Sequence, residues 1–221
     1  MPVFAQLPDE TSGKVPELDA FHKPIYGLWH EAWPAKDIQR LRELFPQVES
    51  MYKKLAAAML PGILRDKQTR WDEKKGELRA AVDEYRQSIE GNDTTRILRA
   101  AEVVHRVYEQ MVRIVRPVTQ EIDEFHRALY LLHHYYIPEK NIVMIKKNAE
   151  DLAKAMNAVD TVTVPPRWDK KKDQYEKRRV LLSDAVKNYV AAVRTAEPFD
   201  TLAKLKNVVH SRFQMLESVF E

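Results

Sequence analysis

The stretch that decides the fold is ELDAFHKPIYGLWHEAWP at residues 17–34, because the chain repeats it as EIDEFHRALYLLHHYYIP at residues 121–138. With an offset of 104 and no gap, eight of the 18 positions are identical. They are Glu17/Glu121, Asp19/Asp123, Phe21/Phe125, His22/His126, Tyr26/Tyr130, Leu28/Leu132, His30/His134 and Pro34/Pro138. The match resumes where Val-Val-His at 103–105 corresponds to Val-Val-His at 208–210. The repeat predicts two units of one architecture.

The histidines follow this repeat closely. Six of the seven fall into three matched pairs, and only His133 has no counterpart. The pairs are His22/His126, His30/His134 and His105/His210. Histidine is the commonest metal ligand in proteins, so the pattern predicts one histidine site in each unit.

Composition narrows the class of protein. A chain of 221 residues fits one large domain or two of about 110 residues. The low number of glycines, five in the whole chain, disfavours sandwiches and barrels, which need many tight turns. The net charge of +3 is small and the basic runs are local, so we expect no nucleic-acid partner. The absence of cysteine excludes disulfides, thiolate zinc sites, cysteine nucleophiles and covalent haem attachment.

The sequence also bears on location. No run of about 18 apolar residues is present, so we expect no membrane insertion. Val3-Phe4-Ala5 followed by Gln6 resembles the end of a removed signal peptide. This favours a periplasmic or otherwise exported protein, with the cytoplasm as the alternative.

Apolar residues recur at three- and four-residue spacing throughout, which predicts an all-α chain. Prolines and glycines at 34, 61–62, 91, 117 and 138 separate the segments. The predicted helices are 17–33, 36–59, 67–90 and 94–115, then 118–137, 139–158, 168–195 and 199–220. We therefore predict a tandem duplication of a four-helix up-down bundle, about eight helices in total. A flexible arm at 1–15 precedes the first repeat at 16–116 and the second at 117–221. Pro24 predicts either a helix start near His22 or a kink.

The first helix of each half carries a stripe of histidine and tyrosine. His22, Tyr26 and His30 recur every four residues and share one helix face, as do His126, Tyr130 and His134. Eight residues rise about 12 Å, so the two histidines of one helix cannot ligate one ion. In an up-down bundle, counting from the helix ends pairs His22 with His105 and His126 with His210. His30 and His134 would then lie about two turns away.

Carboxylates accompany these histidines. Asp19 and Asp123 lie three residues before a stripe histidine, and Glu102 lies three before His105. Carboxylate-x-x-His on two helices is part of the di-iron pattern, which needs a Glu from each remaining helix. The candidates are Glu49 with Glu77, Asp83 or Glu84, but the second half has Ala153, Lys187 and Asn207 at matched positions. A complete di-metal site is therefore expected in one half at most.

The leading interpretation is a metal-binding or metal-carrying protein with one site per repeat, in a binding role and not as an enzyme. Imidazole sites without thiolate suit zinc, copper or iron. The alternatives are a b-type haem bundle, a di-metal oxidase-like enzyme, and an interaction scaffold with a protein partner. In the last case the His–Tyr stripe would be a packing and hydrogen-bond network. If the matched histidines are the ligands, His133→Ala should leave metal content unchanged.

Overall fold

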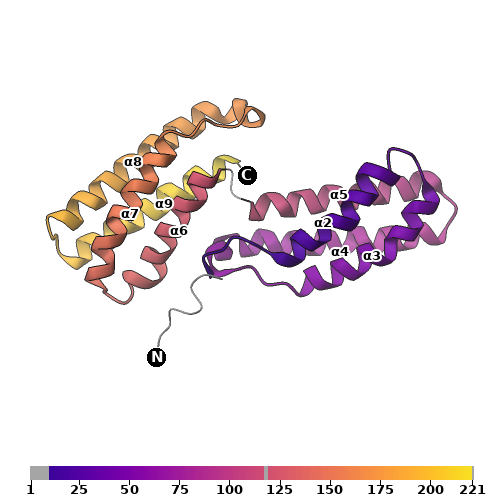
Figure 1. The fold of residues 1–221 in the computed structure, drawn as a ribbon, viewed down its shortest axis with the longest axis horizontal. Helices are drawn as coiled ribbons and strands as arrows, with labels where there is room; N and C mark the ends of the chain where they lie inside the picture. Colours follow the sequence, from indigo (N-terminus) through magenta and orange to yellow (C-terminus); the bar gives the residue numbers. More distant parts are fainter. Residues whose placement is uncertain (1–9, 117–118, 221) are drawn as a thin grey trace. The chain divides into compact units, whose positions relative to one another are not determined.

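The computed structural model describes residues 10–116 and 119–220, and over this part the chain is all-α, with eight α-helices and no strand. The chain divides into two compact units, residues 1–116 and 117–221 (Figure 1). None of the described helices combines the length and the hydropathy needed to span a membrane.

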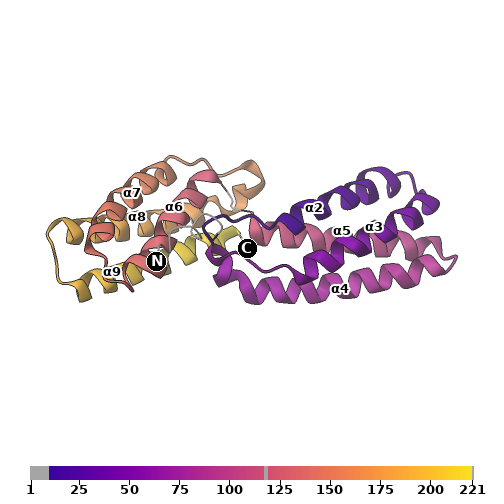
Figure 2. The same cartoon turned by 60° about the horizontal axis from the view of Figure 1, so that its bottom comes forward.

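Within the described residues each unit contains four α-helices, with a π-helical and a 3-10 segment at the same places in the order; the helices are labelled in Figure 2. Unit 1 contains α2 (Pro16–Tyr26), the π-helix η2 (Gly27–Ala32), α3 (Ile38–Ala57), the 3-10 helix η3 (Gly62–Lys67), α4 (Gln68–Glu90) and α5 (Thr94–Val115). Unit 2 contains α6 (Gln120–Leu131), the π-helix η4 (Leu132–Tyr136), α7 (Ile142–Asp160), the 3-10 helix η5 (Pro166–Lys171), α8 (Lys172–Arg194) and α9 (Phe199–Glu217), followed by a short 3-10 turn, η6 (Ser218–Phe220). The predicted all-α, eight-helix fold is confirmed.

The two units share the order of their elements, and some elements have matching bounds. The bounds of α4 and α8 differ by 104 at both ends, and so do those of η3 and η5. The link before α9 is one residue longer than the link before α5, so equivalent positions in these last helices differ by 105. Residues related by these offsets are equivalent. The common origin of the units by duplication stays a prediction.

Each unit has its own core. In unit 1, Phe21 on α2 and Tyr85 on α4 are fully buried, and in unit 2 the equivalent Phe125 and Tyr189 are too. On α5 the buried side chains recur every three or four residues, which is the pattern expected of a helix with one face on the core. Burial of this apolar surface is the main stabilising contribution in each bundle.

The first helix of each unit ends in the same motif. Lys36 has φ 52°, its N–H donates to the carbonyl of Trp33, and the N–H of Asp37 donates to the carbonyl of Ala32. Unit 2 has the same pair of bonds around Lys140, also at φ 52°. This is the Schellman arrangement, which satisfies the last carbonyls of a helix. Asp37 and Asn141 then cap the next helix through their side chains.

The first helix of unit 1 continues through Pro24. α2 begins at Pro16 and continues past Pro24 to Tyr26, so Pro24 does not start the helix. The π-helix that follows is not caused by Pro24, because unit 2 has Ala128 there and the same π-helix. Of the predicted arm, residues 10–15 are described: Val15 is buried and Glu10 pairs with Arg65 at 3.9 Å. Residues 1–9, which include the signal-like stretch, and the boundary residues 117–118 lie outside the described part.

Candidate functional site

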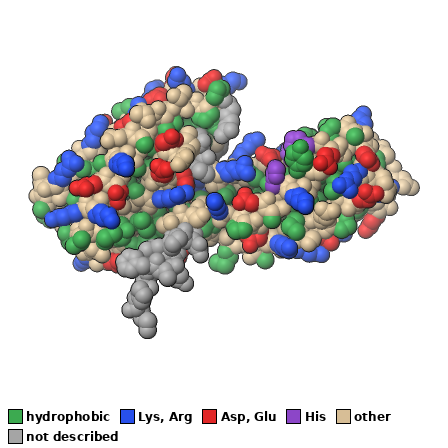
Figure 3. All heavy atoms as spheres, in the orientation of Figure 1, with side chains coloured by type: hydrophobic (Ala, Val, Ile, Leu, Met, Phe, Trp, Pro, Cys, Tyr) green, Lys and Arg blue, Asp and Glu red, His purple; other side chains and the backbone are tan. Residues whose placement is uncertain are grey.

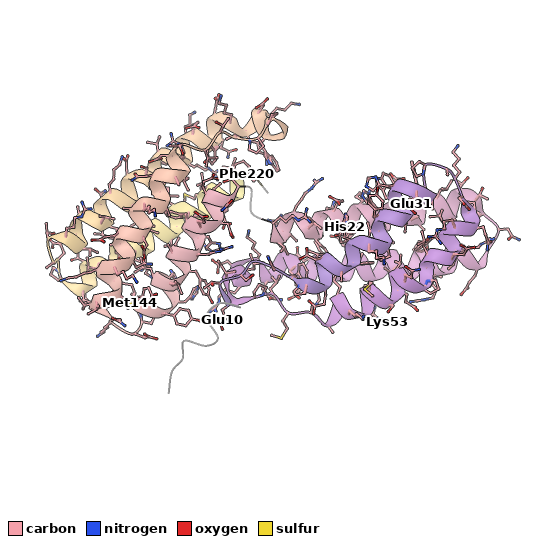
Figure 4. The ribbon with its side chains drawn as sticks, in the orientation of Figure 1. Glu10, His22, Glu31, Lys53, Met144 and Phe220 are labelled. Atoms are coloured by element: carbon pink, nitrogen blue, oxygen red, sulfur yellow. The ribbon has the colours of Figure 1, made fainter. Side chains whose placement is uncertain are left out.

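The predicted stripe of unit 1 forms a continuous row of rings on one face of α2 and η2. The ring centroids of His22 and Tyr26 are 6.1 Å apart, and those of Tyr26 and His30 are 4.8 Å apart. All three side chains are exposed. Figure 3 shows histidine side chains at the surface of this unit, and Figure 4 labels His22 on α2.

The structure does not bring His22 and His105 together as counting predicted. His22 lies beside Tyr108, with ring centroids 6.4 Å apart, while His105 stacks on Trp29 at 4.2 Å with the rings 7° from parallel. The reason is how far the two helices are shifted along their axes. The indole of Trp33, at the end of η2, donates to the carbonyl of Leu98, which lies about one turn into α5.

His105 is a half-buried imidazole in this arrangement. Burial lowers its pKa below the ordinary value of 6.5, and the nearby His30 acts in the same direction. Glu109 and Glu102 oppose the shift because their negative charges favour the imidazolium. Burial between the helices therefore favours the neutral form of the His105 imidazole.

In unit 2 the equivalent of Trp29 is His133, the one histidine that the repeat left unmatched. Its ring lies 4.0 Å from that of His210 on α9 and 4.7 Å from that of His134, measured between centroids. Three of the four histidines of unit 2 therefore form a cluster, which we call the unit 2 histidine cluster. It is held by η4 on one side and α9 on the other.

A buried lysine completes this cluster. Lys206 is only 6% exposed, and its Nζ lies 3.3 Å from Nδ1 of His133 and donates to Oδ1 of Asn207 at 2.7 Å. Burial lowers the pKa of the Lys206 amine. The equivalent residue in unit 1 is Ala101. Unit 1 thus combines the large indole of Trp29 with a small alanine, whereas unit 2 combines the smaller imidazole of His133 with a long lysine.

The remaining predicted residues of unit 2 lie beside the cluster. His126 packs on Phe213, with ring centroids 4.7 Å apart. Phe213 is three residues beyond His210, so the contact made by His126 lies about 4.5 Å farther along α9. Tyr130 is buried and lies 4.6 Å from the ring of His134. Asp123 forms an ion pair with Arg127.

The carboxylates of the di-metal alternative are engaged in ion pairs on α3, α4 and α5. Glu49 pairs with Arg86 at 2.6 Å, Glu84 with Arg96 at 2.7 Å, and Glu77 with Lys74 at 2.7 Å. Asp83 pairs with the same Arg86. Asp19 and Glu102 are exposed. Across residues 10–116 and 119–220, no three His, Asp or Glu side chains are placed as they stand to hold one metal ion.

Sequence reasoning missed His133 and Lys206. A signal for both was present in the sequence, because they break the repeat together: His133 replaces Trp29 and Lys206 replaces Ala101. Paired departures at positions that meet across two helices indicate a changed site. Comparison with known proteins adds no assignment, since no protein-family model, curated protein or solved structure matches the chain.

Proposed function

We propose that this protein binds a transition-metal ion through the unit 2 histidine cluster, in a binding or carrier role. The observation that supports the proposal is the contact between His133 and His210, whose rings lie 4.0 Å apart across two helices. Two nitrogens on one tetrahedral zinc ion are about 3.3 Å apart, given bonds of about 2.05 Å. Metal binding would require side-chain rotations that bring one nitrogen of each ring to this separation.

His134 is the third ligand in this proposal. Its ring is 4.7 Å from that of His133, and solvent can supply the remaining position, because His133, His134 and His210 are all partly exposed. Imidazole donors without thiolate suit zinc, copper(II) or iron. Unit 1 offers a different environment, since Trp29 covers His105 where unit 2 has a second imidazole. The proposal therefore has one site per chain, and not the two that the matched histidines predict.

Lys206 opposes metal binding in this arrangement. Its Nζ occupies the neighbourhood of Nδ1 of His133, and its charge repels a cation. A metal that uses this nitrogen must displace the amine. The expected effect of Lys206→Met is therefore tighter metal binding with the same stoichiometry. Weaker binding in this variant would instead make the amine a contributor to the site.

Elemental analysis of untagged protein, after loading with zinc, copper(II) or iron and desalting, tests the function. About one equivalent per chain supports the proposal, and two equivalents would favour a site in each unit. An absorption spectrum on the same sample tests the haem alternative, which predicts a Soret band after addition of haemin. If the protein retains neither metal nor haem, the interaction scaffold is the hypothesis that remains. An exported location is a separate proposal, supported only by the stretch at residues 3–6.

A further inference from the structure

A groove lies between α7 and α8 of unit 2, on helices that do not carry the histidine cluster. Its volume is about 240 Å³. Ala153 and the buried Met156 on α7 and the buried Val186 and Val190 on α8 provide its apolar surface. Lys187 and other exposed polar side chains form the rim. The two helices lie side by side in Figures 1 and 2.

The equivalent surface of unit 1 is filled. Glu49 replaces Ala153 there, and Arg86 replaces Val190. Nη2 of Arg86 donates to Oε1 of Glu49 at 2.6 Å and Nε donates to the same oxygen at 3.0 Å. Two long, paired side chains thus cover the helix junction in unit 1. Short apolar side chains leave it open in unit 2, so the groove is a specific difference between two otherwise matched bundles.

The charge of this surface is reversed as well. Lys187 stands where unit 1 has Asp83, and Arg194 stands where unit 1 has Glu90. The contact of Lys187 with Asp184 is 3.7 Å long, and both side chains are more than 60% exposed, so it contributes little. Within the described residues, Arg194 forms no ion pair. The groove therefore has an apolar floor and two cations at its rim that no strong pair neutralises.

We propose that this groove binds a small monocarboxylate with a short alkyl chain. The alkyl chain would lie on Val190 and Val186, and the carboxylate would pair with Arg194, whose guanidinium can donate two parallel hydrogen bonds, while Lys187 adds positive charge to the rim. The volume is below the range of about 300–1,000 Å³ typical of sites for drug-sized ligands. This favours a ligand the size of hexanoate over a long-chain fatty acid. The inference is independent of the proposed metal site.

Titration of the full-length protein with hexanoate, followed by methyl NMR, tests this site. Saturable shifts are expected at the methyl groups of Ala153, Val186 and Val190. Hexanamide has the same shape without the charge, so it should bind at least about tenfold more weakly, as expected for loss of a charge-assisted hydrogen bond. Replacing both rim cations, Lys187→Gln with Arg194→Gln, should weaken hexanoate binding by a similar factor. Both positions are exposed, so the variant keeps its fold.

Two further variants complete the experiment. Ala153→Glu with Val190→Arg restores the side chains of unit 1 and should abolish binding while far-UV circular dichroism stays unchanged. Lys53→Gln with Arg79→Gln removes two exposed cations from the equivalent, filled surface of unit 1, and should bind hexanoate like wild type. The proposal is overturned if hexanoate gives no saturable shift at these methyl groups. Equal affinity for hexanamide, or for the variant without rim cations, would overturn it as well.

Discussion

His133 and Trp29 stand at equivalent positions and give the two units different chemistry. In unit 1 an indole stacks on His105, and in unit 2 an imidazole meets His210. The internal repeat predicts sites at the matched histidines and no role for His133. Matched residues record what two repeats share, which includes packing. A site that exists in one repeat only is found among the residues that differ.

The half-buried His105 gives a prediction about pH. Its pKa is lowered in the folded state, first by burial, while the unfolded chain titrates near 6.5. The unfolded state therefore binds the proton more readily. The contribution of His105 to stability is complete above about pH 6.5 and is lost as pH falls from there through the lowered pKa. A histidine NMR titration should place the midpoint of His105 below 6.5. A midpoint at or above 6.5 would contradict the buried, neutral ring.

Tyr85 and Tyr189 provide a matched pair of buried phenols. The hydroxyl of Tyr85 donates to the carbonyl of Leu41 at 2.7 Å, whereas that of Tyr189 has no hydrogen-bond partner among the described residues. Removal of a made hydrogen bond costs about 1 kcal/mol, and removal of a buried unpaired hydroxyl costs nothing or stabilises. Urea unfolding should therefore show a loss of about 1 kcal/mol for Tyr85→Phe and none for Tyr189→Phe. Equal losses in both would show that the second hydroxyl is also bonded.

At the scale of the element, the end of α8 carries a strained residue. Ala196 has φ 53°, its N–H donates to the carbonyl of Val193, and Glu197 donates to Ala192. A left-handed conformation costs a non-glycine residue about 1–2 kcal/mol. Ala196→Gly should therefore raise the free energy of unfolding by roughly 1 kcal/mol. The control is Ala155→Gly inside α7, where the conformation is helical and a loss of about 1 kcal/mol is expected. Similar losses of unfolding free energy in both variants would contradict the inference that Ala196 is strained.

The sequence predicted the elements better than it predicted their contacts. The helix expected at 94–115 is Thr94–Val115 in the structure, because a glycine, a capping aspartate and a proline bound it. The π-helices η2 and η4 were not predicted, since a widened turn has no compositional signal. They matter for the site. A wider turn changes the angle between successive side chains, and the equivalent positions 29 and 133 contact the last helix of their units.

At the scale of the whole molecule, the chain is two bundles, each with its own core. The buried residues of unit 2 form a cluster drawn from residues 122–219 alone. We therefore expect the fragments 1–116 and 117–221 to fold separately. Each should give a helical circular dichroism spectrum and a cooperative thermal transition, because each buries a complete four-helix core. A fragment that is unfolded on its own, while the full chain is folded, would contradict this expectation.

The central claim is that His133, a position at which the two repeats differ, creates the metal site. The most direct test is a calorimetric titration of zinc into wild type, His133→Ala and, as the control, His22→Ala, an exposed histidine of unit 1. The account predicts one zinc per chain in wild type and in His22→Ala, and loss of this binding in His133→Ala. Undiminished zinc binding by His133→Ala, or no binding by wild type, would contradict it.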